Sequence, residues 1–481
     1  MNSTTFSFGK NASVAPMPVN SSFKFTPEIQ KFLTGKQLLL DDIPFSHELI
    51  QTHYENGYIR LREGIIQKDK HPVCVRCGNS DPQWFAEIPC ARCGQTEWYC
   101  RNCLMMGRMS ECTRLFSWNG PVPKPVIPEP ILEWSGQLSE GQTEAADRVV
   151  NAIRTNSELL VWAVCGAGKT EILFQGIAAG LAAGNRICIA TPRTDVVLEL
   201  TPRLKKAFPA IAIASLFGGS EERHLYAPLT ITTTHQLMRF YHAFDVIILD
   251  EVDAFPFTVD ESLKYAAAHA RKPVSTMIYL TATPNEKWQR ECRLGKRAFV
   301  TIPARFHRHP LPVPEFVWSG NWQKQVKKGK FPASVRRWIS TRLQAQKQAL
   351  VFFPHIPLME KALPFVRQLD PNIETVHAED PKRKEKVEKM RSQEISILLT
   401  TTILERGVTI PNIDVAVIGA EDDIFTESAL VQIAGRAGRS VEYPSGNVTF
   451  FHYGKTAAMQ KARRQIVEMN RLGRKKGLID A

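Results

Sequence analysis

The sequence predicts an α/β fold with two parallel-sheet lobes in tandem, preceded by a small cysteine-rich module. From residue 135 onward, short apolar runs are separated by helix-length segments, and such non-alternating runs are typical of strands buried on both faces of a parallel sheet. Before that point, seven of the ten cysteines lie between Cys74 and Cys112. A chain of 481 residues is also long enough for roughly three domains.

Composition divides the chain into six predicted segments. The first is polar and offers few apolar side chains to bury, and the fourth is stiffened by five prolines within twelve residues. In order they are a disordered tail (1–22), an N-terminal helical segment (23–70), a cysteine module (71–118), a proline-rich linker (119–134), the first lobe (135–312) and the second lobe (313–481).

Continuous apolar runs mark the expected strands of both lobes. They are residues 159–164, 187–190, 246–249 and 276–280 in the first lobe, and 349–353, 395–399 and 415–418 in the second. Residues 171–184 have apolar side chains at helical spacing and end on Gly184, which suits a helix C-cap.

The net charge of +13 and the pI of about 9.2 indicate a polyanionic partner, of which nucleic acid is the commonest. Basic residues gather in residues 324–337 and 455–476, and the second cluster has the composition of a phosphate-contacting tail. No apolar run approaches the roughly 20 residues that cross a bilayer. We therefore expect a cytoplasmic protein without direct membrane insertion, which could lie peripherally at the cytosolic face of the membrane.

A small-residue turn follows the first predicted strand and opens a helix at Lys169 and Thr170. This strand–turn–helix context is typical of a phosphate loop, in which backbone N–H groups surround phosphate oxygens. We expect Lys169 to contact the β- and γ-phosphates of ATP and the Thr170 hydroxyl to coordinate Mg²⁺. The predicted nucleotide-binding residues of this loop are Ala163, Val164, Cys165, Gly166, Ala167, Gly168, Lys169 and Thr170.

Catalytic side chains are expected at two further places. Asp250 and Glu251 follow the predicted strand 246–249, where Asp250 would hold Mg²⁺ and Glu251 would deprotonate the attacking water. In the second lobe, Arg436 and Arg439 would supply positive charge as the γ-phosphate leaves. The predicted catalytic set is Lys169, Asp250, Glu251, Arg436 and Arg439.

The cysteine module contains paired CxxC turns, which predict a structural zinc site. The favoured primary ligands are Cys74, Cys77, Cys100 and Cys103. The other cysteines of the module are Cys90, Cys93 and Cys112. Either these three hold a second zinc ion, or Cys90 and Cys93 form a CxxC turn that binds no metal. An iron–sulfur cluster and a disulfide redox role are weaker alternatives.

Arginines and aromatic side chains also occur together in this module. This combination suits either single-stranded nucleic acid, by stacking and phosphate contact, or the small core that such a module needs. The residues are Arg76, Arg92, Arg101, Arg108 and Arg114, with Trp84, Phe85, Trp98 and Tyr99.

The order of these motifs resembles that of superfamily 2 helicases and translocases. The matching runs are Gln142 and residues 163–170, 190–193, 233–235, 250–253, 281–284, 400–411 and 432–439. The resemblance implies that the lobes are RecA-like, with ATP in the cleft between them. It further implies that Gln142 reads the adenine edge, that Thr281 and Thr283 link nucleotide state to lobe closure, and that Gly407 and its neighbours face the nucleotide or the bound strand.

With its zinc module ahead of the first lobe, and with residues 99–108 and 250–256, the chain resembles the ComFA family of late-competence ATPases. That family is associated with ATP-dependent import of single-stranded DNA through a membrane channel. The resemblance implies a DNA-stimulated ATPase that drives DNA uptake in natural transformation, with ATP, Mg²⁺ and Zn²⁺ as cofactors. The implied partners are single-stranded DNA and competence DNA-uptake proteins, including a membrane channel.

Two alternatives stay open at this stage. One is a replication or repair helicase of the PriA type, although PriA cysteines interrupt the second lobe whereas these precede the first. The other is a nucleic-acid-binding scaffold that ATP merely switches between conformations. The residues do not distinguish strand unwinding from translocation alone, and they indicate neither the polarity of movement along the strand nor the oligomeric state.

Overall fold

The computed structural model describes residues 14–480 apart from 16, 70 and 407–409. Most of the predicted tail and Gly407 therefore lie outside the described residues. The described chain forms two compact units. The first extends to Gly136 and adds Ala146–Leu159 and Leu173–Tyr279, and the second comprises Gln137–Ala145, Leu160–Ile172 and the chain from Leu280.

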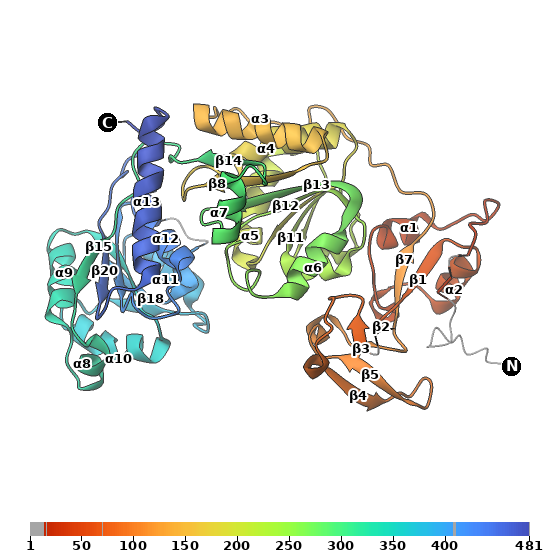
Figure 1. Ribbon diagram of the computed structural model, residues 1–481, viewed down its shortest axis with the longest axis horizontal. Helices are drawn as coiled ribbons and strands as arrows, with labels where there is room; N and C mark the ends of the chain where they lie inside the picture. The colour runs from red at the N-terminus through yellow and green to blue at the C-terminus, as the bar shows by residue number, and fades with distance from the viewer. Residues whose placement is uncertain (1–13, 16, 70, 407–409, 481) are drawn as a thin grey trace. The chain divides into compact units, whose positions relative to one another are not determined.

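The N-terminal region of the first unit combines short helices with small antiparallel sheets (Figure 1). The helices are α1 (Pro27–Leu33) and α2 (His47–Glu55), and the strands are β1 (Ile59–Glu63), β2 (Ile65–Lys68), β3 (His71–Cys74), β4 (Phe85–Pro89), β5 (Thr96–Cys100), β6 (Met109–Ser110) and β7 (Arg114–Trp118). Helices α1 and α2 lie in the predicted N-terminal helical segment, but so do the strands β1 and β2, which the sequence analysis did not predict. β1 pairs with β7, β2 with β3, and β5 with both β4 and β6.

The first parallel sheet has the strand order β10-β11-β9-β12-β13-β8-β14. Its strands are β8 (Glu158–Ala163), β9 (Ile187–Thr191), β10 (Ile213–Leu216), β11 (Leu229–Thr233), β12 (Phe244–Leu249), β13 (Arg271–Thr281) and β14 (Phe299–Ile302). The helices of this region are α3 (Glu140–Arg154), α4 (Glu171–Ala182), α5 (Thr194–Ala207), α6 (Glu261–Ala270) and α7 (Glu286–Arg293). Every strand predicted here from an apolar run is present.

The second parallel sheet has the order β15-β20-β19-β16-β18-β17. Its strands are β15 (Glu315–Trp318), β16 (Gln348–Phe352), β17 (Glu374–Val376), β18 (Ile397–Thr400), β19 (Ile413–Ile418) and β20 (Val448–His452). Its helices are α8 (Trp322–Lys327), α9 (Ala333–Gln344), α10 (Ile356–Arg367), α11 (Arg383–Arg391), α12 (Glu427–Ala434) and α13 (Ala457–Lys475). The prediction of two α/β lobes with parallel sheets is confirmed.

Burial explains why the apolar runs form central strands. Every residue of β9 and of β19 is buried, as expected for strands covered on both faces. The helix α4 ends as predicted near Gly184, whose φ of +77° is the left-handed conformation that glycine adopts without strain. The basic C-terminal stretch is not a tail, because it forms the long helix α13, and Lys461 on it pairs with Glu286.

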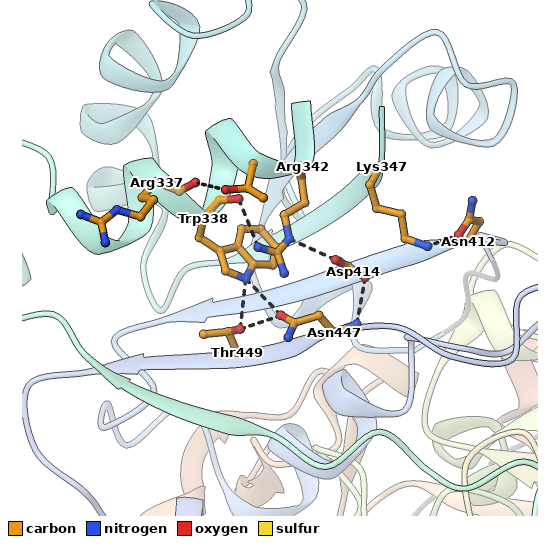
Figure 2. Close-up of polar contacts among 9 residues, drawn as sticks. Arg337, Trp338, Arg342, Lys347, Asn412, Asp414, Asn447 and Thr449 are labelled. Carbon is orange, nitrogen blue, oxygen red and sulfur yellow. Dashed lines mark hydrogen bonds and ion pairs between the residues drawn. The ribbon is translucent and has the colours of Figure 1, made fainter. Parts of the chain in front are cut away.

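A polar network ties α9 to β19 and β20 in the second sheet. Figure 2 shows the Trp338 indole N–H directed at Asn447 and Thr449, and its nitrogen lies 3.1 Å from Asn447 Oδ1 and 3.0 Å from Thr449 Oγ1. Arg342 lies over the Trp338 ring and donates to Asp414 at 3.0 Å. The opposite Asp414 oxygen accepts from the Asn447 backbone N–H at 2.9 Å. Each polar group that α9 buries on the sheet is therefore matched.

We expect Trp338→Phe to lower the free energy of unfolding by about 1–3 kcal/mol, because it removes the donor from two acceptors that are largely shielded from water. Urea unfolding followed by circular dichroism measures this. Trp318→Phe is the matched control, since Trp318 is 65% exposed and should change little. Equal unfolding midpoints for the two variants would contradict a stabilising role for the network.

Candidate nucleotide site and metal centres

The phosphate loop lies between β8 and α4, as the sequence predicts. Gly166 and Gly168 have φ values of +82° and +70°, which turn the backbone in a way that other residues resist. The buried Gln142 side chain donates to the Ala167 carbonyl at 2.9 Å and accepts from the Ser139 N–H at 2.8 Å. A Cβ at Gly168 would lie 2.3 Å from the Gln142 amide nitrogen, so this turn requires glycine. Gln142 thus supports the loop, and its contact with adenine stays a prediction.

Arg305, which the sequence analysis did not single out, lies against this loop. It is 2% exposed, and its Cγ lies 3.5 Å from the position of a Cβ at Gly166. Its guanidinium donates to the carbonyl oxygens of Gly438 and, at 3.3 Å, of Gly435. Burial, and then the charge of Arg439, lower the pKa of Arg305 to about 10. Positive charge therefore gathers beside the phosphate loop. In the sequence, the only signal for Arg305 was that it is a basic residue in a proline-flanked stretch.

The run 432–439 contacts the loop within the same compact unit. The Cys165 thiol donates to Gln432 Oε1 at 3.0 Å, and a Cβ at Gly435 would lie 2.5 Å from that of Cys165. Arg436 is buried and donates to the Glu405 carbonyl at 2.8 Å, and Arg439 donates to the Gly435 carbonyl at 2.9 Å. The glycines of this run thus let it pack closely against the phosphate loop. The roles of the two arginines in hydrolysis stay predictions.

A chain of hydrogen bonds starts at the motif that contains Thr281 and Thr283. The Thr281 hydroxyl accepts from the Thr283 backbone N–H at 3.0 Å, and the Thr283 hydroxyl donates to Ser428 at 2.9 Å. Arg406, which is 1% exposed, donates to the same Ser428 hydroxyl at 3.2 Å. Ser428 on α12 therefore joins two sequence motifs, and no motif had marked it.

The acids Asp250 and Glu251 belong to the first unit, directly after β12. The Asp250 backbone N–H donates to the Ala190 carbonyl at 2.8 Å, which extends the pairing of β12 with β9. Glu251 has a φ of +56°, and its backbone N–H donates to Asp250 Oδ1 at 2.8 Å. Left-handed backbone at a residue other than glycine costs roughly 1–3 kcal/mol and is found mainly at functional sites. This turn is held under strain where the sequence places the catalytic acids.

The four favoured cysteines come together as a closed cluster. The sulfurs of Cys74, Cys77, Cys100 and Cys103 lie within 4.8 Å of one another and all four residues are buried. The Cys74–Cys103 and Cys77–Cys100 sulfurs are each 3.7 Å apart. Four sulfurs at about 2.3 Å from a tetrahedral zinc ion would be about 3.8 Å apart. The cluster therefore has the size and the donor set of a structural zinc site.

Positive charge and N–H groups surround these sulfurs. Arg76, which is 3% exposed, donates to Cys103 Sγ at 3.0 Å, and the side-chain amides of Asn79 and Asn102 lie 3.8 and 3.7 Å from Cys100 and Cys77 Sγ. A hydrogen bond from Cys100 is the largest cause that lowers the pKa of the Cys103 thiol, and the Arg76 charge acts in the same direction. Such outer contacts stabilise thiolates and fix their orientation toward a metal.

The other three cysteines form a second group. The sulfurs of Cys90, Cys93 and Cys112 also lie within 4.8 Å of one another. Glu97, which is 4% exposed and was not singled out from the sequence, accepts from the Cys112 backbone N–H at 2.7 Å. Burial raises the pKa of Glu97, but hydrogen bonds from the Cys90 thiol and from Cys112 outweigh it and hold the pKa below its usual value. A carboxylate is thus available beside three thiols.

The arginines of the cysteine module divide between its interior and its surface. Arg76 and Arg114 are buried, as is Phe85, whereas Trp84 is 49% exposed. The exposed arginines are Arg92, Arg101 and Arg108. Some of these side chains therefore belong to the small core, and others form a basic surface with an exposed indole. Nucleic-acid binding by that surface stays a prediction.

Comparison with protein-family models matches three parts of the chain. Residues 21–117 match the competence protein ComFA N-terminal domain, residues 135–286 match the type III restriction enzyme res subunit, and residues 333–441 match the helicase conserved C-terminal domain. The chain thus carries a helicase-like ATPase architecture behind the N-terminal domain of ComFA. Among the described residues, no helix combines the length and the apolar character needed to cross a membrane.

Curated relatives cover nearly the whole chain. Competence protein ComFA of Bacillus subtilis (strain 168) is 47% identical over 95% of this chain and 98% of its own length, and that of Streptococcus pneumoniae (strain ATCC BAA-255 / R6) is 38% identical over 84% and 92%. Among solved structures, a variant of S. cerevisiae Dbp5 bound to RNA and ADP BeF3 superimposes with a TM-score of 0.50 at 11% identity, covering 71% of this chain and 98% of that one, and this likeness concerns the fold alone. With such identity over most of its length, the chain belongs to the ComFA family of competence proteins.

Proposed function

We propose that this protein is a DNA-stimulated ATPase that moves single-stranded DNA during uptake in natural transformation. The observation that carries the ATPase is the phosphate loop, in which two left-handed glycines turn the backbone beside the buried guanidinium of Arg305. The names of the relatives, which are competence proteins, support the role in transformation. The basic net charge of +13 supports a polyanionic substrate.

The proposed reaction is hydrolysis of the bond between the β- and γ-phosphates of ATP. Lys169 would hold these phosphates, and Thr170 and Asp250 would hold Mg²⁺, which would supply charge neutralisation at the phosphate oxygens. Glu251 accepts a proton from the water that attacks the γ-phosphorus, and the β–γ bridging bond breaks to release ADP.

The proposed role of the second lobe is to stabilise the leaving phosphoryl group. Arg436 and Arg439 neutralise charge that develops as the γ-phosphoryl transfers. The chain from Thr283 through Ser428 to Arg406 offers a route by which nucleotide state reaches the second lobe. Because motors of this kind hold the phosphate and sugar of the strand, movement is expected to be independent of base sequence.

The proposed role of the cysteine module is structural, with one zinc ion on Cys74, Cys77, Cys100 and Cys103. A second zinc ion is proposed on Cys90, Cys93 and Cys112, with the Glu97 carboxylate or a water molecule as the fourth ligand. The proposed partners are proteins of the DNA-uptake machinery, and among them a membrane channel would pass the moving strand.

We expect the intact protein to hydrolyse ATP faster with single-stranded DNA than with RNA, duplex DNA or no polymer. Glu251→Gln should reduce this turnover by about 10²–10⁴-fold while leaving DNA binding in place, because it removes the proton acceptor and no phosphate contact. Lys169→Ala should also abolish turnover. Glu261→Gln is the control, since Glu261 lies exposed on α6.

A phosphate-release assay combined with DNA binding by fluorescence anisotropy measures both quantities. Equal turnover for wild type and Glu251→Gln would contradict the proposed site. Turnover that no polymer stimulates would instead favour a scaffold that ATP switches.

We expect two zinc ions for each wild-type chain and one for Cys74→Ser or for Cys93→Ser, because each variant opens a different cluster. Metal analysis of the purified proteins by mass spectrometry gives the ratio. Cys292→Ser is the control, since Cys292 belongs to neither cluster. A single zinc ion that Cys93→Ser retains would show that the three-cysteine cluster holds no metal.

A further inference from the structure

The N-terminal segment contacts the first parallel-sheet region within the same compact unit, along a line that we call the seam. The Gln37 backbone N–H donates to the Arg239 carbonyl at 2.7 Å, and the Gln37 side chain donates to the Met238 carbonyl at 3.0 Å. Lys36 forms an antiparallel bridge with Phe240. Backbone pairing therefore fixes the two sides of the seam relative to each other.

A cavity of about 120 Å³ lies in the seam. Both sides contribute to its lining, and Leu216 at the carboxyl end of β10 is part of it. In open α/β sheets, ligands bind near the carboxyl ends of the strands. The lining residues are Phe32, Lys36, Leu38, Asp42, Leu216, Arg223, Arg239 and Phe240.

Lys36 is the most deeply buried cation of this cavity. It is 2% exposed, and its ammonium group donates to the Arg223 carbonyl at 2.8 Å and lies 4.7 Å from the centre of the Phe32 ring. An ammonium group has three donors, and within the described part of the chain no carboxylate pairs with Lys36. Burying a cation without a counter-charge is costly, so its position requires an explanation.

Further cations adjoin Lys36. Arg239 has a side chain that is 16% exposed and pairs with Asp42 at 3.2 Å, while Arg223 is exposed at the edge of the cavity. Arg186 is 5% exposed nearby and donates to the Thr34 carbonyl at 3.2 Å. The three cations of the lining, less the charge of Asp42, leave two net positive charges around the cavity.

The same arrangement shifts the pKa of Lys36. Burial, followed by the charges of Arg186 and Arg239, lowers the pKa of Lys36 to about 7. A bound anion would favour the charged form and oppose all three causes. This cluster of cations is thus electrostatically unfavourable in a way that an anionic ligand would relieve.

We propose that the seam binds a phosphate group through Lys36, Arg223 and Arg239. The net charge of the cavity matches a phosphate dianion, and its volume suits one tetrahedral oxyanion rather than a nucleotide. Guanidinium and ammonium groups together are the usual donors to phosphate oxygens. The group can come from free orthophosphate or from the backbone of a polynucleotide, and the second source would extend the proposed DNA contacts to the N-terminal domain.

Thermal unfolding of the full chain tests the first source. Orthophosphate at about 10 mM, against chloride at equal ionic strength, should raise the Tm by about 2 °C if its Kd is about 1 mM. All proteins carry Lys169→Ala, so that the phosphate loop does not contribute. Arg223→Ala and Lys36→Met should lose this shift. Arg203→Ala should keep it, because Arg203 is a half-exposed arginine on α5 that pairs with Glu199 and is not part of the cavity lining.

Binding of a 20-nucleotide oligo-dT, followed by fluorescence anisotropy across salt concentrations, tests the second source. If the cavity holds a backbone phosphate, Arg223→Ala should weaken binding several-fold and reduce the salt slope by about one, and Arg203→Ala should not.

The phosphate site is supported if Arg223→Ala loses, and Arg203→Ala keeps, either the rise in Tm with orthophosphate or the wild-type affinity for oligo-dT. Which of the two is lost identifies the source of the phosphate. If Arg223→Ala and Lys36→Met alter neither response, the proposal is wrong and the cations only join the two sides of the seam. The Tm arm does not depend on ATP turnover, so its failure is distinguishable from failure of the proposed motor function.

Discussion

Arg305 lies against Gly166 of the phosphate loop and donates to the carbonyl groups of Gly435 and Gly438. This contact leaves little room at Gly438, where a Cβ would lie 2.9 Å from the guanidinium, whereas a Cβ at Gly166 would lie 3.5 Å from Arg305 Cγ, an ordinary contact distance. Buried donors are costly when they are left unpaired, and here two guanidinium nitrogens of Arg305 donate to backbone carbonyls of the 432–439 run. The packing of this run against the phosphate loop, on which the proposed catalysis depends, therefore follows from one guanidinium and three glycines.

The four-cysteine cluster is also a buried group of polar atoms that neighbouring side chains contact. Its sulfurs lie in the interior of a small module, and Arg76 and the side-chain amides of Asn79 and Asn102 lie beside three of them. The Gly78 turn of this module packs against the Tyr265 ring of α6, and the Tyr265 hydroxyl donates to the Val75 carbonyl at 3.1 Å. A turn of the cysteine module thus contacts α6, the helix that follows the Asp250–Glu251 acids.

The fold class could be predicted from the sequence because strands buried on both faces leave continuous apolar runs, as in β9, β12 and β19. The phosphate loop and the cysteine groups were equally visible, since glycine and cysteine spacing carries the geometry. Arg305, Ser428 and Glu97 could not be found in this way, because their roles come from contacts between segments distant in sequence. Edge strands such as β15 and β17 are short or partly exposed, and so they lack a clear apolar run. The domain boundaries and the catalytic roles of the site residues remain predictions.

In the proposed mechanism, cations of the second lobe act on the phosphates held by the glycine-rich loop. This is tested by comparing ATP affinity and single-turnover hydrolysis for wild type and Arg439→Gln, with DNA present. We expect similar nucleotide affinity and a loss of hydrolysis rate of about 10³-fold or more. An Arg439→Gln protein that hydrolyses ATP at the wild-type rate would contradict it.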